Sequence, residues 1–223
     1  MTDHAALQSL LGARHSCRSF KDTPVDREII EQILMDAGQV PSWCNAQPWQ
    51  VIVTSGAKTD AFRAAMLQAT ETHAPSPDFP FPERYSGAHQ ARRRTCGFQL
   101  YEALGIPKSD RAATARQMTE NYRFFGAPHV ALITTATELG AYGALDCGGY
   151  ITAFCLSAQA QGIATIPQAA IAYYSDVVRG HFGIPEDRRV LAAVSFGYTD
   201  QDHPANSFRT ARAGLNEYVE WKE

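Results

Sequence analysis

Four side chains that suit an anion lie within five positions near the amino terminus. Arg14 and Arg18 carry guanidinium groups, and His15 and Ser16 between them add an imidazole and a hydroxyl. Guanidinium groups form paired, charge-assisted hydrogen bonds to phosphate, so this set of residues suits an anion such as a phosphate. The same pattern also occurs by chance on solvated surfaces, so its interpretation depends on a second motif.

The second motif is a Pro-rich turn over residues 41–49, with the sequence Pro-Ser-Trp-Cys-Asn-Ala-Gln-Pro-Trp. Its polar members, Ser42, Asn45 and Gln47, present short hydroxyl and amide groups beside aromatic rings. Such a turn can hydrogen-bond the polar edge of a planar heterocycle. The alternative is that Ser42 and Asn45 only cap the turn to which they belong.

The elements that must position these motifs alternate between helix and strand. Helical spacing predicts helices over residues 26–39, 57–72, 144–161 and 175–182, and two more between 83 and 121. Short apolar runs predict strands over 49–54, 128–135 and 190–198, with an extended piece at 164–167. The strands at 128–135 and 190–198 are apolar enough to be buried on both faces. The alternation favours an α/β layer and the long peripheral helices favour α+β, so the pattern alone leaves both open.

Composition narrows the function classes. The length predicts one domain over residues 1–223. Lys and Arg number 20 against 23 Asp and Glu, and the resulting net charge of −3 argues against nucleic-acid binding. Five cysteines without a Cys-x-x-Cys pair, and an amino terminus without a signal-like apolar run, predict a reducing, cytoplasmic location.

Several common sites have no motif in this sequence. The stretch 144–161 is too polar for a membrane span, and the histidines lack the i, i+4 spacing of a metal site, so neither membrane nor metal is expected. The Gly-rich loops of dinucleotide and phosphate-loop folds are missing, as is the Gly-x-Ser-x-Gly elbow of serine hydrolases.

Together the motifs resemble the FMN-dependent nitroreductase family, whose members typically carry Arg-x-Ser-x-Arg and then a Pro-Ser…Asn-x-Gln-Pro-Trp turn. Three more segments are similar to its bacterial nitroaromatic and nitrobenzoate reductase branch: Phe-Phe-Gly-Ala-Pro at 124–128, Ile-Pro-Gln-Ala at 166–169 and Asp-His-Pro-Ala-Asn at 202–206. The resemblance implies an α+β, nitroreductase-like fold with a central mixed β-sheet wrapped by helices. It also implies a carboxy-terminal extension that crosses a dimer partner.

The resemblance further implies non-covalent FMN. Arg14, Arg18 and Arg212 would hold its phosphate, with Arg209 as a second candidate, because a dianion held away from bulk water needs more than one cation. From the residues alone, solvated surface charges are the favoured interpretation of the two carboxy-terminal arginines, and the family pattern raises the functional interpretation above it. The backbone N–H of Ala169 would point at flavin N5, so no side chain is expected to act as a catalytic acid. The full predicted cofactor site comprises Arg14, His15, Ser16, Arg18, Pro41, Ser42, Asn45, Gln47, Pro167, Gln168, Ala169, Arg209 and Arg212.

The reaction implied by the resemblance has two half-reactions. NAD(P)H reduces the flavin and leaves, and a small aromatic acceptor such as a nitroaromatic compound then stacks in the same place, beside Trp43, Phe124 and Phe125. The Phe pair could also be simple core. Two alternatives stay open: a flavin reductase of enones, quinones or halogenated phenols, and a flavin-binding protein with little turnover.

The stretch Ala144–Gln161 predicts a homodimer. It has one charged residue and several small ones, which leave no obvious solvent face. A helix that is apolar all round must be buried, and a partner subunit is a natural cover. The resemblance implies that the two flavins are shared, with the phosphate arginines from one chain and the Pro-Ser turn partly from the other.

Overall fold

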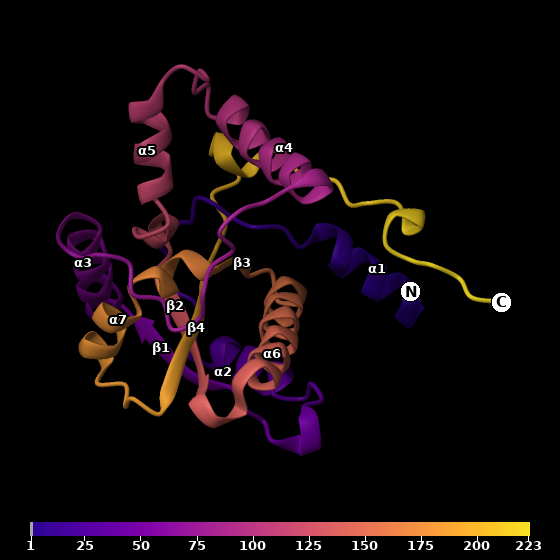
Figure 1. The fold of residues 1–223 in the computed structure, drawn as a ribbon, viewed down its shortest axis with the longest axis horizontal. Coiled ribbons are helices and arrows are strands. Elements are labelled where there is room, and N and C mark those ends of the chain that lie inside the picture. Colours follow the sequence, from indigo (N-terminus) through magenta and orange to yellow (C-terminus); the bar gives the residue numbers. More distant parts are fainter. Residues whose placement is uncertain (1) are drawn as a thin grey trace.

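The computed structural model describes residues 2–223. In this part of the chain a small sheet lies at the centre, with helices on both sides (Figure 1). The strands are β1 (Gln50–Ser55), β2 (His129–Ala136), β3 (Ala164–Gln168) and β4 (Arg188–Gly197). The α-helices are α1 (Asp3–Ala13), α2 (Arg27–Ala37), α3 (Ala57–Thr72), α4 (Gly87–Ala103), α5 (Arg111–Thr119), α6 (Gly140–Ala160) and α7 (Ser175–Phe182).

The sheet is antiparallel. Its strand order is β1-β2-β4-β3, and every neighbouring pair of strands runs in opposite directions. The expected α+β fold is present, but the prediction of a mixed sheet needs correction. Among residues 2–223 the parallel pairing is limited to an isolated bridge between Ser16 and Thr165, where the amino-terminal segment meets β3.

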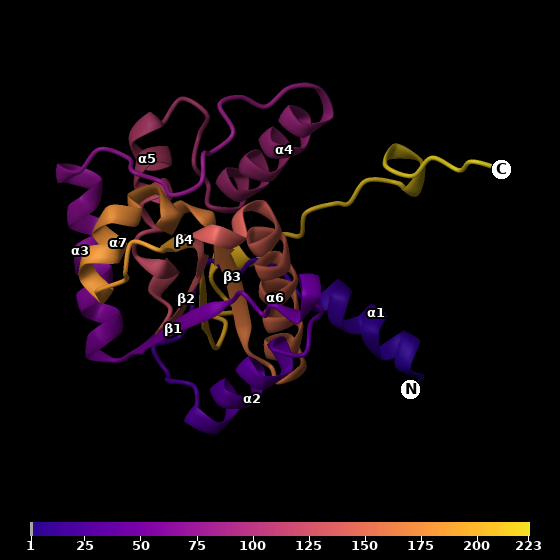
Figure 2. The same cartoon turned by 60° about the horizontal axis from the view of Figure 1, so that its bottom comes forward.

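The two central strands are covered on both faces, as their apolar sequences predicted. On one face, Val130 and Leu132 of β2 pack with residues of α3 and α7; on the other, Ala131 and Ile133 pack with α2 and α6. Successive side chains of a strand point to opposite faces, so a continuous apolar run fills both cores. Figure 2 shows α3 and α7 on one side of the sheet and α2 and α6 on the other.

The predicted elements agree with the structure to within a few residues, with one omission. Helix α1, which has no buried residue, was not predicted. Helices α4 and α5 lie beyond the ends of the strands, and the carboxy-terminal residues extend away from the body of the molecule (Figures 1 and 2). No helix within residues 2–223 is long and apolar enough to cross a membrane.

The segment between α5 and β2 has an unusual backbone. Phe124 and Phe125 both have positive φ, at 58° and 52°, and Gly126 follows at 78°. Bulky residues rarely adopt this left-handed conformation, which costs on the order of 1–3 kcal/mol each. The surrounding structure must therefore hold this segment in place.

Candidate functional site

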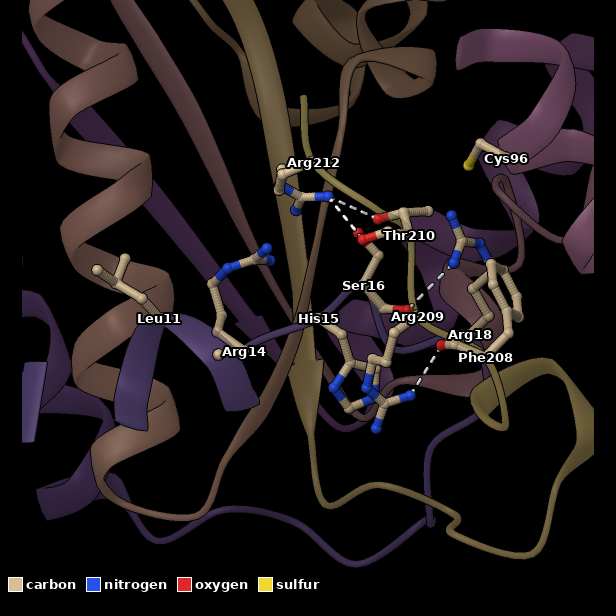
Figure 3. A pocket seen from close by; sticks show the side chains of 11 residues that line it. Leu11, Arg14, His15, Ser16, Arg18, Cys96, Phe208, Arg209, Thr210 and Arg212 are labelled. Atoms are coloured by element: carbon tan, nitrogen blue, oxygen red, sulfur yellow. Dashed lines mark hydrogen bonds between the residues drawn. The ribbon is translucent and has the colours of Figure 1, made fainter. Parts of the chain in front are cut away.

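A cavity of about 310 Å³ collects the arginines of both termini. Arg14 and Arg18 reach it from the segment after α1, and Arg209 and Arg212 from the carboxy-terminal segment (Figure 3). Its remaining lining residues are Leu11, Gly12, His15, Ser16, Cys96, Phe208 and Thr210. The structure thus brings together all six of the predicted site residues that belong to the two terminal motifs.

Backbone pairing explains how two segments so far apart in sequence meet. The N–H of Cys17 donates to Thr165 O at 3.0 Å and that of Lys21 to Tyr198 O at 2.8 Å, so the amino-terminal segment runs along β3 and the end of β4. Asn206 then fixes the carboxy-terminal loop against it. Its Oδ1 accepts from the N–H of Arg18 at 2.7 Å, and its Nδ2 donates to Ser19 O at 3.0 Å.

Asn206 is a site residue that the sequence-based prediction missed. It is 6% exposed, and both ends of its amide are bonded. The available signal was its place at the end of the Asp-His-Pro-Ala-Asn segment, but nothing in a single sequence says that its partner lies 188 residues away. Thr210 was missed too; its Oγ1 accepts from Arg212 Nη1 at 2.8 Å.

Neutral acceptors hold three of the four guanidinium groups of the cavity. Arg18 donates to Ser16 O at 3.2 Å, Arg209 to Asn206 O at 2.8 Å, and Arg212 to Thr210 O at 3.0 Å. Within residues 2–223 none of the four arginines forms an ion pair with a carboxylate. Carbonyls orient a guanidinium without neutralising it, so the cavity keeps an uncompensated positive charge that favours an anion.

The same charge acts on His15. Burial lowers the pKa of this imidazole, and the guanidiniums of Arg209, Arg14 and Arg18 lower it further, against the effect of a hydrogen bond to Ala13 O at 3.0 Å. At neutral pH the ring is therefore neutral, and its Nδ1–H donates to that carbonyl. His15 thus contributes a neutral polar group to the cavity.

A second cavity of about 250 Å³ adjoins the first and shares Ser16 and Arg18 with it. Pro167 and Ile166 of β3 form one wall, and residues of α4, α5 and the turn after α5 form the other. Pro167 therefore lies beside the arginine cavity, and Ala169 follows two residues later in an exposed position. Gln168 is turned the other way: it is 2% exposed, and its amide is bonded within the protein.

The Pro41–Gln47 turn lies elsewhere on the chain. The N–H of Trp43 donates to Asp146 near the start of α6 at 3.0 Å, whereas the arginine segment bridges to Thr165, beyond the end of α6. Helix α6 has 21 residues and is about 31 Å long. The two motifs that carry the resemblance thus lie toward opposite ends of this helix, and none of residues 41–47 lines either cavity.

The polar side chains of this turn, of which Asn45 and Gln47 are exposed and Ser42 is half-buried, have their hydrogen bonds within the turn. The N–H of Gln47 donates to Ser42 Oγ at 2.9 Å, and its Nε2 donates to Asn45 Oδ1 at 3.2 Å. Cys44, Asn45 and Gln47 all have positive φ, between 48° and 55°. The turn-capping alternative therefore describes their present contacts, and the turn presents a preformed polar surface.

The three residues predicted to contact a substrate have different surroundings. Phe125 lines the second cavity. Trp43 is 67% exposed and packs against Tyr142 with ring centroids 5.6 Å apart. Phe124 is fully buried against Phe62, with ring centroids 5.0 Å apart, so the prediction that it forms a pocket wall is corrected to a core role. Its left-handed backbone turns the ring inward, which sequence spacing cannot reveal.

No group of three His, Cys, Asp or Glu residues within the described chain is arranged to hold a metal ion.

Comparison with known proteins gives a consistent picture. The family model described as "Nitroreductase family" matches residues 11–198. Nitroreductase NfnB of Mycolicibacterium smegmatis is 38% identical over 213 residues, which cover 95% of this chain and 91% of that protein. A 4-nitrobenzoate reductase of a Nocardioides species is 31% identical over 219 residues, covering 96% and 89%.

The solved structures include a close match in fold. The FMN-dependent nitroreductase NfnB from Mycobacterium smegmatis, in complex with NADPH, has a TM-score of 0.94 and 37% sequence identity to this chain, and the match covers 99% of both chains.

Proposed function

This chain belongs to the nitroreductase family, and we propose that it is an FMN-dependent oxidoreductase that uses NAD(P)H to reduce nitroaromatic or related electron-poor aromatic compounds. The observation that carries the proposal is the cavity in which four arginines converge, none of them ion-paired with a carboxylate within residues 2–223. The names of the relatives support it, because they describe nitroreductases and a structure with NADPH.

The residues of the cavity fit the phosphate end of FMN. A phosphate monoester carries nearly two negative charges at neutral pH and accepts several hydrogen bonds. Arg14, Arg18 and Arg212 supply the charge, with Arg209 beside them, and Ser16 adds a hydroxyl donor. The remainder of the cofactor site is proposed to include His15, Pro167 and the Ala169 backbone. Of the predicted set, Gln168 is proposed to act through the backbone that it anchors, because its side chain is buried.

The chemistry is divided between cofactor and protein. The chemistry that FMN would supply, when bound, is the two-electron transfer from NAD(P)H to the acceptor. The protein binds the phosphate with its arginines and offers the N–H of Ala169 as a fixed donor. Apolar side chains of the second cavity, among them Phe125 and Met118, offer a surface against which a flat ring can lie. Catalysis then rests on placing reacting atoms about 3–3.5 Å apart and on oriented backbone donors.

A homodimer is part of the proposal, because the polar turn lies away from the arginine cavity. A second copy can supply Ser42, Asn45 and Gln47 to the flavin ring of the first, with Pro41 shaping the turn. The exposed apolar face that such a partner would cover includes Trp43, Tyr142 and Leu145, which are 67%, 63% and 68% exposed. The carboxy-terminal residues Tyr218 and Trp221 are 69% and 75% exposed, as expected of an extension that crosses a partner.

Two further statements belong to the proposal. The chain is one domain over residues 1–223, which is supported by the two core clusters that share β2 and β4. Its location is the cytoplasm, which is supported by five free cysteines.

Spectroscopy of the purified protein tests the proposal directly. We expect a yellow protein that releases FMN rather than FAD, is bleached by NADPH or NADH without air, and recovers its colour when 4-nitrobenzoate is added. Recovery with quinones or enones but no nitroarene would change the acceptor class. A flavin that stays oxidised with both nucleotides would indicate a binding protein, and a colourless protein that ignores added FMN would refute the proposal.

A further inference from the structure

Gln168 uses both ends of its buried amide to join two parts of the molecule. Its Oε1 accepts a hydrogen bond from the Ser195 hydroxyl of β4. Its Nε2 donates to the backbone carbonyl of Asn121, just after α5, at 2.8 Å. The side chain is 2% exposed and Ser195 is fully buried. A buried amide with both ends bonded is a rigid connection.

The two parts that Gln168 joins are the opposite walls of the second cavity. Pro167, its neighbour in β3, lies in one wall. Asn121 and Phe125 lie in the other, together with Gln117 and Met118 of α5. The Gln168 amide therefore spans from the strand that forms one wall to the segment that forms the other.

The wall that contains Phe125 is the one that needs an anchor. Phe124 and Phe125 have the left-handed backbone described above. Arg63 holds the far side of this segment, because its Nε donates to Arg123 O at 3.0 Å and its Nη2 to Ala127 O at 2.8 Å. Gln168 holds the near side through Asn121. A conformation of this kind persists only where the surroundings over-determine it.

We propose that Gln168 is a positioning residue that sets the spacing between the Pro167–Ala169 backbone and the Asn121–Phe125 wall. Ser195 orients the amide so that its N–H₂ group faces Asn121. A flat molecule that lies between the walls is then aligned with the Ala169 N–H. The hydrogen bond between Gln168 and Asn121 sets this alignment, although it contacts neither the flat molecule nor the Ala169 N–H. This inference rests on the proposed function for its catalytic consequence, but not for its structural one.

The main test replaces Gln168 with Met, which has a similar length and no amide. The arginine cavity is untouched, so the Gln168→Met variant should bind FMN within about threefold of wild type. Its kcat/KM for 4-nitrobenzoate should fall about 10- to 100-fold, because a misplacement on the order of 1 Å has that effect on rate. The matched control is Gln68→Met on the exposed surface of α3, which should behave as wild type.

Hydrogen exchange of the apoprotein gives a readout that does not depend on flavin. In the Gln168→Met variant, the amides of residues 122–127 should exchange at least about tenfold faster, while the β2 and β4 core keeps its protection. A general loss of protection across the sheet would instead indicate a purely structural residue and overturn the proposal. Wild-type exchange together with wild-type kcat/KM would overturn it as well.

The Gln168→Glu variant adds a second test, which is the pH dependence of kcat/KM. In Gln168→Glu, the carboxylate can still accept from Ser195 but faces the Asn121 carbonyl without a proton to donate. Burial raises the pKa of such a carboxyl, so its proton returns on mild acidification. The ratio of variant to wild-type kcat/KM should therefore rise as the pH falls from 8 to 5, whereas the ratio for Gln168→Met stays flat. Equal pH profiles for the two variants would contradict the proposal.

A milder variant covers the case in which Gln168→Met does not fold. Ser195→Ala removes only the hydroxyl that orients the amide, and it should give the same local pattern of exchange with a smaller loss of kcat/KM, about tenfold or less. Wild-type exchange in folded Ser195→Ala would count against the proposal. If wild-type protein fails to bind FMN, the proposed function is refuted, and the exchange experiment still decides whether Gln168 anchors the wall.

Discussion

The arginine cavity and the Pro41–Gln47 turn contain the two motifs of the resemblance, yet they satisfy their polar groups in opposite ways. In the cavity, carbonyls orient the guanidiniums and leave their charge uncompensated. In the turn, Gln47 bonds both Ser42 and Asn45, so the polar groups already have partners. We therefore propose that the cavity is a complete anion site within one chain. The turn, in the same proposal, is a preformed surface that a second copy of the chain brings to the ligand.

The largest effect is expected from a variant that dissociates the proposed dimer and so removes the partner's turn from the arginine cavity. Leu145 is 68% exposed on α6, so Leu145→Asp should leave the fold intact while placing a charge in the proposed dimer face. We expect the dimer dissociation constant to rise about 100-fold or more, since an unpaired charge buried at an interface costs several kcal/mol. FMN affinity should fall with it, because the turn no longer reaches the cavity. Light scattering and fluorescence titration with FMN measure the two quantities.

Met35→Asp is the control, because Met35 is also exposed, at 57%, but lies on α2. A monomeric Leu145→Asp variant that binds FMN as wild type does would show that the cavity alone makes the whole site.

The next effect concerns the cavity itself. Arg14→Ala and Arg212→Ala each remove a charged donor worth roughly 1.5–3 kcal/mol, so each should weaken FMN binding by about one to two orders of magnitude. Titration of the apoprotein by flavin fluorescence gives the dissociation constants. Arg27→Ala, which removes an exposed ion pair with Glu31, should change nothing. If all three variants bind FMN equally well, the phosphate lies elsewhere.

A smaller effect is expected at the turn. Asn45 is exposed in the single chain but has a positive φ, which Asn tolerates better than Ala, so Asn45→Ala should lower the melting temperature only slightly. If the partner's flavin ring receives a neutral hydrogen bond from it, the rate of flavin reduction by NADPH should fall about two- to tenfold. Stopped-flow absorbance and the midpoint potential measure this. An unchanged rate and potential would mean that Asn45 only shapes the turn.

The last effect is on stability and concerns the segment that leads through α2 into the turn. The N–H of Val25, just before α2, donates to Nε2 of buried His129 at 2.9 Å, and Nδ1 meets Ser55 Oγ at 2.8 Å. Burial lowers the pKa of His129 below 6.5, so on acidification the unfolded chain takes up a proton first. The free energy of unfolding should therefore fall below about pH 6.5, by at most about 1.4 kcal/mol per pH unit.

Urea unfolding between pH 8 and pH 5 checks this slope, and His129→Gln should reduce it. Because Val25 anchors the chain that continues through α2 into the turn, hydrogen exchange at acid pH should rise in the turn before it rises around Asn206. Faster exchange around Asn206 before any change in the turn would contradict the prediction that protonation of His129 loosens the turn first.

How far the sequence predicts this molecule depends on whether a feature is local. Short apolar runs predict the strands, and helical spacing predicts most of the helices. Arg14, Ser16 and Arg18 lie together in one motif. The prediction that these residues lie near Arg209 and Arg212 came from the family resemblance and not from the residues. Asn206 was missed because its bonds to Arg18 and Ser19 join distant parts of the chain. Phe124 was misjudged for a related reason: a positive φ at a Phe is imposed by tertiary contacts and leaves no pattern in the sequence.

The uncompensated arginines also have a practical consequence for anyone who handles the protein. The chain as a whole is anionic, with a net charge of −3, yet the proposed phosphate site implies that this cavity attracts tetrahedral anions. Phosphate buffer and ammonium sulfate supply such anions in large excess over any flavin, and added salt screens the remaining attraction. Purification in these solutions should strip the cofactor, and reconstitution should work best in a dilute buffer without oxyanions.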